Sequence, residues 1–345
     1  MKRVVILGHF AFGKDYINGQ TIKTKVISEE LTRRFGAQQV GKEDTAGKYK
    51  FLLRLPLILF RMLIKYRNII FLPAYKGVHV IVPLLVCLNI IFRRKLHYVV
   101  IGGWLPTYLQ KYPHLKWAIR QLNGIYVETE LMKQDILKTG RYSNIYVMPN
   151  CKSLRIIPEE AFPTLQGPPY KICTFSRVIE EKGIADAVKA VEACNLEANH
   201  PLFVLHIYGP IEEPEWFAEL MENRTDAIKY CGVVPYEDSI DILKNYTALL
   251  FPTYYHGEGF AGTIIDALHA GIPTIASNWK ANPEFIEEGV TGLLYPARSI
   301  KALTEILTNV SKQPEMLWNM KKNCIQKARS YMPGIVLQTL IKQLN

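Results

Sequence analysis

The chain has 345 residues, of which 49% are hydrophobic and 21% charged, so it is long enough for two hydrophobic cores and too apolar for a disordered protein. Its net charge of +11 is unevenly divided, because residues 1–167 carry 26 Lys and Arg against 10 Asp and Glu, whereas residues 168–345 carry 16 against 21. The six cysteines show no C-x-x-C pair, which favours reduced thiols in a cytoplasm over a disulfide framework.

Residues 1–150 alternate between short apolar runs and helical patterns. The apolar run at 4–7 is too short for a signal peptide, so it is predicted to be the first strand. Short β-branched runs that alternate with helices predict right-handed crossovers and a parallel sheet. The expected strands are residues 4–7, 68–73, 95–101, 124–127 and 144–148, and the expected helices are residues 19–35, 51–67, 77–94 and 131–139.

The expected helix at 51–67 is both basic and apolar. No acidic residue lies between Asp44 and Glu128, a stretch with thirteen Lys and Arg. Such a helix is more typical of an anionic membrane surface than of nucleic-acid recognition. A span is disfavoured because Arg54 and Arg61 would each cost about 2.5–3.5 kcal/mol at a bilayer centre. A solvated helix face with no partner is the alternative.

Residues 150–169 are rich in proline and have weak periodicity, so the interdomain linker is placed there. An N-terminal domain at 1–167 and a C-terminal domain at 168–330 follow, and residues 331–345 are expected to form a helix that packs back on the first domain. A second alternating series fills the C-terminal domain. Its expected strands are 170–175, 202–208, 228–230, 248–251, 274–276 and 292–295, and its expected helices are 182–194, 214–223, 239–244, 262–270, 299–309 and 314–331.

Both halves are thus predicted to be doubly wound α/β domains whose ligands bind at the carboxyl ends of the strands. The first chemical signal is Arg177 and Lys182, which lie five residues apart in a strand-to-helix loop. That spacing lets both cations converge on one anion, and both suit phosphate oxygens. The alternative is a pair of solvated charges balanced by Glu180 and Glu181.

A stronger signal is the glycine-rich loop that precedes the expected helix at 262–270. Gly257, Gly259 and Gly262 allow close backbone approach, and N–H groups at the start of the helix would form an anion site. The carboxylates of Glu258 and Asp266 could accept hydrogen bonds from sugar hydroxyls, one on a transferred sugar and the other on a ribose. A plain strand-to-helix turn is the alternative.

These residues resemble the donor-binding half of retaining glycosyltransferases of family 4, which have the GT-B fold. Glu258 and Asp266 form a variant of the family's E-x7-E motif, with Asp in the second position. Arg177, Lys182 and Gly183 match its Arg…Lys-Gly pair. Two further stretches match the family pattern in the same order, residues 270–275 (AGIPTI) and residues 283–296 (PEFIEEGVTGLLYP).

The resemblance implies a role for each matching residue of the C-terminal half. Arg177 and Lys182 would bind the donor diphosphate, Glu258 the donor sugar and Asp266 the nucleotide ribose. The loop after Gly232 would line the base pocket. The remaining donor contacts would come from the loop and the first turn of the helix, at Gly259, Phe260, Ala261, Gly262 and Thr263.

The N-terminal half fits the family more loosely. Gly19, at the start of a helix, fits the family's glycine-rich loop near the donor phosphates. Where the family often has a histidine, this chain has Gly103 and Trp104, which could line the sugar or acceptor site, as could His256. Core packing is the alternative for Trp104. The histidines show no metal-binding spacing, so no metal is expected.

The expected function is therefore a metal-independent retaining glycosyltransferase, cytoplasmic and peripheral to the inner face of the membrane. Its donor would be a nucleotide-diphosphate sugar, with UDP the expected nucleotide, and its acceptor a saccharide that is plausibly lipid-linked, as in polysaccharide or glycolipid biosynthesis. The alternatives are a non-hydrolysing sugar-nucleotide epimerase and a non-catalytic nucleotide-sugar-binding subunit. Nucleic-acid binding is not expected, because no recognition motif accompanies the charge.

Overall fold

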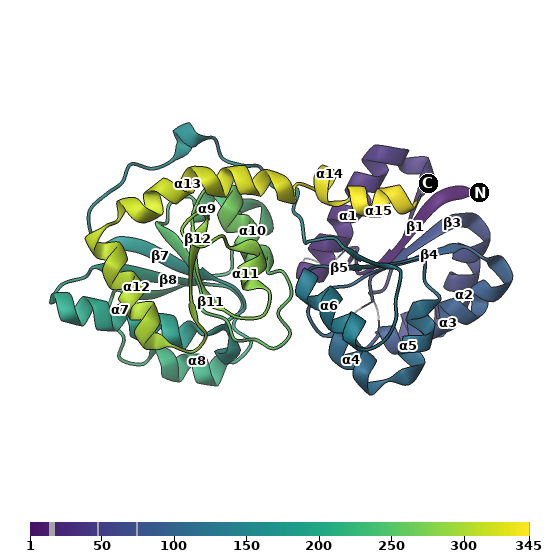
Figure 1. Cartoon of the computed structure of the whole chain (residues 1–345), viewed down its shortest axis with the longest axis horizontal. Coiled ribbons are helices and arrows are strands. Elements are labelled where there is room, and N and C mark those ends of the chain that lie inside the picture. Colours follow the sequence, from purple (N-terminus) through teal and green to yellow (C-terminus); the bar gives the residue numbers. More distant parts are fainter. Residues whose placement is uncertain (14–17, 47, 74, 345) are drawn as a thin grey trace. The chain divides into compact units, whose positions relative to one another are not determined.

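The computed structural model describes residues 1–13, 18–46, 48–73 and 75–344, with the side chains of residues 48–50 and 52 left out. The chain divides into two compact units (Figure 1). Unit 1 combines Met1–Ser153 with Tyr331–Asn345, and unit 2 is Leu154–Ser330. The change of unit therefore comes fourteen residues before the expected boundary at 167/168.

Unit 1 has a parallel sheet of order β2-β1-β3-β4-β5-β6. Its strands are β1 (Lys2–Gly8), β2 (Val40–Asp44), β3 (Tyr66–Phe71), β4 (Lys95–Val99), β5 (Gly124–Val127) and β6 (Ile145–Val147). Its helices are α1 (Gly19–Phe35), α2 (Lys48–Lys65), α3 (Val78–Phe92), α4 (Leu105–Lys111), α5 (Pro113–Arg120), α6 (Glu130–Lys138), α14 (Pro333–Val336) and α15 (Gln338–Gln343).

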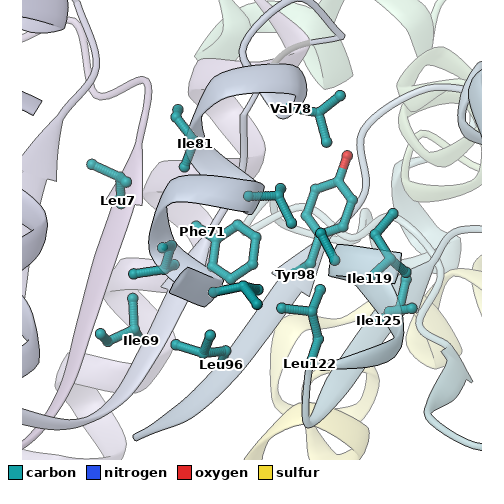
Figure 2. Packing of buried hydrophobic residues seen from close by; sticks show 14 of the residues in the cluster. Leu7, Ile69, Phe71, Val78, Ile81, Leu96, Tyr98, Ile119, Leu122 and Ile125 are labelled. Carbon is teal, nitrogen blue, oxygen red and sulfur yellow. The ribbon is translucent and has the colours of Figure 1, made fainter. Parts of the chain in front are cut away.

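The core of unit 1 lies on both faces of this sheet, because successive residues of each strand point to opposite faces. On β1, Val5 and Leu7 join one buried cluster, and Val4 and Ile6 join the other. Figure 2 shows the first cluster, in which the ring of Phe71 stacks on that of Tyr98 at 5.4 Å. Such two-sided burial explains why the strands appear in the sequence as continuous apolar runs.

The second face of the unit 1 sheet is covered in part by the end of the chain. α14 and α15 lie beside α1 (Figure 1), and Val336, Leu340 and Leu344 are buried in the same cluster as Val4 and Ile6. The single helix expected at 331–345 is instead two short helices separated at Leu337. β2, α4 and α5 were not expected either.

Unit 2 has a parallel sheet of order β12-β11-β10-β7-β8-β9. Its strands are β7 (Tyr170–Phe175), β8 (Phe203–Tyr208), β9 (Ile228–Gly232), β10 (Ala248–Phe251), β11 (Thr274–Asn278) and β12 (Gly292–Pro296). Its helices are α7 (Ile184–Ala198), α8 (Pro214–Met221), α9 (Ser239–Leu243), α10 (Gly262–His269), α11 (Asn282–Phe285), α12 (Ile300–Lys312) and α13 (Glu315–Ala328). The prediction of two doubly wound α/β halves is confirmed.

The proline-rich segment after Ser153 belongs in part to the core of unit 2. Leu154 and Ile157 are buried there beside Ile272, and the N–H of Ile157 donates to the carbonyl of His269 at 3.0 Å. This packing explains why the change of unit precedes the prolines. Within the described parts of both units, every helix falls short of the length and apolar character that a bilayer crossing requires.

A buried polar network connects three elements of unit 1. His97 on β4 is completely buried, with its Nδ1 3.1 Å from the hydroxyl of Tyr126 and its Nε2 3.4 Å from the Oδ1 of Asn68. The Nδ2 of Asn68 donates to the carbonyl of Leu344 at 3.1 Å, which connects the network to the last turn of the chain. Burial, with a smaller effect of Lys95, lowers the pKa of His97 to about 4.

Unit 1 should therefore lose stability in mild acid. Below its ordinary pKa of about 6.5, His97 binds a proton in the unfolded chain but stays neutral in the folded protein down to about pH 4. The free energy of unfolding should fall across that window by about 3 kcal/mol. Denaturant titrations at pH 7 and pH 4.5 measure this fall. His97→Gln should flatten it and His200→Gln, at an exposed histidine, should not; an equal fall in wild type and His97→Gln would contradict the assignment.

Candidate functional site

The candidate site of unit 2 lies where the order of its sheet reverses. β7 and β10 pair at the centre, and the chain leaves β7 toward β8 on one side and β10 toward β11 on the other. The loops that follow these two strands meet at the same edge of the sheet, which is where doubly wound folds bind ligands. Gly183 permits their close approach, because its φ is +70° and a Cβ there would lie 2.2 Å from the carbonyl oxygen of Pro252.

A buried ion pair joins the two loops. The Nζ of Lys182, after β7, lies 2.5 Å from the Oε2 of Glu258, after β10. The two side chains are only 7% and 8% exposed. Glu258 also accepts a hydrogen bond of 2.9 Å from the hydroxyl of Thr253. The structure therefore brings together the residues that the sequence analysis assigned to the donor diphosphate and to the donor sugar, 76 residues apart in the chain.

Arg177 and Lys182 both lie over the same aromatic ring, that of Tyr255. Its guanidinium carbon is 5.1 Å from the ring centroid of Tyr255, and the Nζ of Lys182 is 5.3 Å from the same centroid. Arg177 also forms an ion pair of 2.9 Å with Glu212. Burial acts to lower the pKa of Arg177, but the hydrogen bond to Tyr255 and the charge of Glu212 prevail and raise it. The alternative of two solvated charges balanced by Glu180 and Glu181 is wrong, because Glu212 and Glu258 are the partners.

Tyr255 itself is held in place by its neighbours. Its N–H donates to the hydroxyl oxygen of Thr253 at 3.2 Å, and its carbonyl accepts from the indole N–H of Trp279 at 2.9 Å. The N–H of Tyr254 donates to the carbonyl of Glu181 at 2.8 Å, which ties this loop to the one carrying Lys182. The sequence analysis did not single out Tyr255 or Glu212, because only the folded chain brings them to Arg177.

The loop after Glu258 leads into α10. Gly262 begins the helix, and Ala261 at the cap position makes no side-chain capping bond to the first-turn N–H groups. In that first turn the hydroxyl oxygen of Thr263 is buried without a hydrogen-bond partner in the described chain. Gly259 is buried, and Phe260 stacks on Phe285 with ring centroids 3.5 Å apart. Phe260 thus anchors the loop by packing, and the first-turn N–H groups form a donor-rich end.

Three other predicted residues of unit 2, Asp266, Gly232 and His256, take no part in the ion pair of Lys182 and Glu258. Asp266, in the second turn of α10, is 3% exposed. Gly232 ends β9 with a φ of +82°, on the outer strand of the sheet. His256 is exposed, and its ring meets that of Trp279 edge to face at 5.5 Å.

The predicted residues of unit 1 lie on the loops after β1 and β4. Gly19 is the first residue of α1, whose cap is the side chain of Asn18, an acceptor for the N–H of Thr21 at 2.9 Å. Residues 14–17 lie outside the described residues. Gly103 and Trp104 follow β4, and the indole N–H of Trp104 donates to the carbonyl of Ile101 at 2.7 Å.

Trp104 belongs to an aromatic cluster that the sequence analysis missed. Its ring lies 4.9 Å from that of Tyr108 and 6.2 Å from that of Tyr75. Tyr108 in turn lies 5.1 Å from His79, which meets Tyr112 at 4.4 Å. The spacing of Trp104, Tyr108 and Tyr112 at every fourth residue was a visible signal, because it places all three on one helix face.

Two buried or partly buried carboxylates of unit 1 also escaped notice. Glu128, directly after β5, forms an ion pair of 2.5 Å with Lys23, and both side chains are almost completely buried. Asp44, at the end of β2, accepts from the N–H groups of Phe10 and Phe12 at 3.0 Å each. Burial acts to raise the pKa of Asp44, but these and neighbouring N–H groups outweigh it and lower the pKa. Asp44 thereby orders the loop after β1.

Comparison with known proteins agrees with this geometry. Residues 155–331 match the sequence family described as "Glycosyl transferases group 1". The chain is 26% identical over 148 residues to the amylovoran biosynthesis glycosyltransferase AmsK of Erwinia amylovora, covering 42% of this chain and 36% of that protein. It is 25% identical over 171 residues to the N,N'-diacetylbacillosaminyl-diphospho-undecaprenol alpha-1,3-N-acetylgalactosaminyltransferase of Campylobacter jejuni, covering 50% and 43%. The chain thus spans less than half the length of these two relatives.

The fold has a counterpart among solved structures. Anabaena HepE, solved in complex with UDP and glucose, superposes with a TM-score of 0.72, at 16% identity and with 100% of this chain and 99% of that chain covered. The predicted GT-B fold is confirmed by this likeness over the whole chain.

The buried ion pair predicts a distinctive pattern of stabilities. Lys182→Met should lower the free energy of unfolding of unit 2 by about 3 kcal/mol, because it leaves the carboxylate of Glu258 buried without its cation. The double variant Lys182→Met/Glu258→Leu should recover most of that loss. Arg155→Ala, which breaks an exposed pair with Asp241, should cost less than about 1 kcal/mol. Denaturant unfolding measures all three, and a double variant no more stable than Lys182→Met would contradict the prediction.

Proposed function

The chain belongs to the glycosyl transferases group 1 family, and from that premise we propose that it transfers a sugar from a UDP-sugar to a saccharide acceptor with retention of configuration. The observation that carries the proposal is the convergence of Arg177 and Lys182 on the ring of Tyr255, beside the uncapped start of α10. Two cations and a helix N-terminus at a sheet's reversal point suit a diphosphate.

The chemistry asked of this site is stabilisation of a leaving group. Breaking the bond between sugar and phosphate builds negative charge on the departing diphosphate and positive charge on the sugar ring. Arg177, Lys182 and the N–H groups of Gly262 and Thr263 would stabilise that negative charge where it develops. Glu258, which Lys182 and Thr253 hold in place, would accept hydrogen bonds from the donor sugar.

In the same assignment, the remaining predicted residues would contact other groups of the donor. The backbone of Gly259, Phe260 and Ala261 would approach the phosphates, with Phe260 fixed by its stacking on Phe285. Gly232 would border the base, and Asp266 the ribose. Asp266 is 3% exposed, so only a small part of its side chain is open to such a contact.

The aromatic cluster of unit 1 supports a saccharide acceptor. Trp104, Tyr75 and Tyr108 follow β3 and β4 at the carboxyl edge of their sheet, where ligands of doubly wound domains bind. Aromatic faces pack against the apolar C–H faces of sugar rings, and Tyr and His add polar atoms for hydroxyl groups. The name of the Campylobacter relative contains a diphospho-undecaprenol group, which supports a lipid-linked acceptor for this chain also.

A lipid-linked acceptor requires access to a membrane surface, and α2 offers a suitable face. Leu53, Leu57, Phe60 and Ile64 recur at helical spacing and are 86%, 72%, 45% and 47% exposed. They form a stripe along α2, which we call the apolar stripe. Arg54, Arg61 and Lys65 flank it on the same helix. An exposed apolar stripe with a basic flank suits the surface of an anionic membrane.

Donor binding is tested most directly by calorimetric titration with UDP. Arg177→Ala should weaken UDP binding at least about tenfold, because a charge-assisted hydrogen bond contributes roughly 1.5–3 kcal/mol. Arg155→Ala, which also removes an arginine paired with an acidic side chain of unit 2, should bind as the wild type does. Equal affinity in all three proteins would remove Arg177 from the donor site.

The need for an acceptor separates a transferase from an epimerase. A transferase should release UDP from a UDP-sugar only when an acceptor is present. Formation of an epimerised sugar without any acceptor would identify an epimerase instead.

Membrane contact is tested by co-sedimentation with vesicles of phosphatidylcholine and phosphatidylglycerol. Leu53→Asp should reduce the vesicle affinity about tenfold, because the exposed leucine could no longer be buried among lipid chains. Leu196→Asp is a matched control, since Leu196 is 83% exposed on α7 and the change in net charge is the same. Equal affinity of the two variants would show that the apolar stripe does not contact the membrane.

A further inference from the structure

Unit 1 contains a cavity of about 710 Å³ at the amino ends of β1, β3 and β4. Among the described residues its lining includes no acidic side chain but six basic ones: Arg3, Arg34, Arg67, Arg93, Arg94 and Lys95. We call it the basic cavity. Within unit 1 it lies at the opposite edge of the sheet from Trp104 and the aromatic cluster, because the strands are parallel and these cations stand at strand starts.

Four of the six cations that line the basic cavity have no acidic partner among the ion pairs of the described residues of unit 1. Arg34, Arg67, Arg93 and Arg94 take part in none of the ion pairs found among the described residues of unit 1. Like charges that converge in one cavity repel each other, and an anion bound between them would relieve that repulsion. Guanidinium groups favour phosphate in particular, since their planar N–H fork matches two of its oxygens.

The walls of the cavity are fixed by local contacts. The guanidinium of Arg3 lies over the ring of Phe35 at 4.2 Å. The Nε of Arg94 donates to the carbonyl of Leu63 at 2.8 Å, which ties the cavity to the end of α2. Asn68 donates to the carbonyls of Arg3 and Leu344, at 3.0 and 3.1 Å. The side chains of Arg3 and Arg94 are therefore held at the wall of the cavity before any ligand arrives.

Arg93 adds evidence from its backbone. It ends α3 with φ 53° and ψ 43°, a left-handed conformation that usually requires glycine or asparagine at this position. Asn89 stabilises the turn, since its side chain accepts from the N–H of Arg94 at 2.7 Å and donates to its carbonyl at 2.9 Å. This turn reverses the chain between α3 and β4 and places Arg93, Arg94 and Lys95 together in the lining of the cavity.

Apolar side chains lie next to these cations. A second hollow, lined in part by Met1, Gln39 and Ile64, shares Met1 and Gln39 with the basic cavity, and Ile64 is the last residue of the apolar stripe. Ile90 and Ile91, in the last turn of α3 before Arg93, are 67% and 79% exposed. Exposed apolar groups beside phosphate-binding cations complement a phospholipid, in which the acyl chains and the phosphate are neighbours in the same way.

We propose that the basic cavity binds the phosphate group of a membrane phospholipid while the apolar stripe, Ile90 and Ile91 contact its acyl region. The proposal rests on the membrane contact proposed above and gives it a defined lipid site in place of a diffuse attraction. One lipid held there would fix the orientation of unit 1 on the bilayer surface.

The test compares two full-length triple variants that remove the same charge. Arg34→Gln/Arg67→Gln/Arg93→Gln removes three of the six cations of the basic cavity, and Lys133→Gln/Lys138→Gln/Arg141→Gln removes three basic residues elsewhere in unit 1. Vesicles of phosphatidylcholine with phosphatidic acid are titrated with each protein at several salt concentrations. Dihexanoyl-phosphatidic acid, below its micelle concentration, and inorganic phosphate are titrated separately. UDP is present at saturation throughout, so that the donor site is occupied.

The expected result is a loss of at least about tenfold in affinity for vesicles and for the short-chain lipid in the cavity variant, with a change below about threefold in the control variant. Equal losses in the two variants would overturn the proposal in favour of a general electrostatic field. Wild-type lipid affinity in the cavity variant would also overturn it. A cavity variant that loses the binding of inorganic phosphate but keeps that of the lipids would overturn it too, because the cavity would then be a site for a soluble anion.

Two measurements keep this test separate from the proposed function. The affinity for UDP, measured without lipid, reports on the donor site independently. The short-chain lipid needs no bilayer for binding, so the basic cavity can be tested even if the apolar stripe does not contact a membrane. If the triple cavity variant does not fold, the single variant Arg34→Glu at the end of α1 replaces it, with a loss of several-fold expected. No loss in a folded Arg34→Glu variant would count against the proposal.

Discussion

The parallel pairing of every described strand is the constraint on which both units depend. A parallel strand cannot be reached by a tight turn, so each connection must cross back over the sheet and return to the same edge. All the loops that follow strands therefore gather at one edge, and all those that precede strands gather at the other. The ion pair of Lys182 and Glu258 lies at the first kind of edge, and the basic cavity of unit 1 lies at the second.

The ion pair of Lys182 and Glu258 has both a structural and a chemical consequence. Two charges that are less than a tenth exposed stabilise each other only while both are present. In the protein without ligand, each neutralises the other and Thr253 completes the contacts of the carboxylate. A diphosphate would compete with Glu258 for Lys182, and sugar hydroxyls would compete with Lys182 for Glu258. A bound donor would thus separate the ion pair and give each residue a new polar partner, the diphosphate for Lys182 and the sugar hydroxyls for Glu258.

Much of the fold was predictable, because two-sided burial makes parallel strands continuous apolar runs. β5, β7 and β10 have the limits expected from sequence alone. β2 was missed because it is an edge strand, reading Val-Gly-Lys-Glu-Asp with one apolar residue. α4 and α5 were missed because they are short and begin with proline-containing turns. The stability of such short elements depends on tertiary packing, so local sequence patterns predict them poorly.

The site was predictable to the extent that its residues lie within short motifs. Arg177, Lys182 and Glu258 stood out because glycine, charge and strand ends occur together around them. Glu212 and Tyr255 did not, since their role depends on pairing across the sheet. The basic cavity is the extreme case, because Arg3, Arg34 and Arg67 lie on three separate elements and meet only where β1 and β3 begin and α1 ends.

The division of the chain between the units has a consequence for its synthesis. Unit 2 is one continuous segment, but unit 1 is completed only by α14 and α15, whose buried side chains Val336, Leu340 and Leu344 fill one face of its sheet. A ribosome makes residues 331–344 only after the whole of unit 2. The face of the unit 1 sheet beside α1 therefore stays partly uncovered until unit 2 has been made, so the unit that is begun first is completed only after the other.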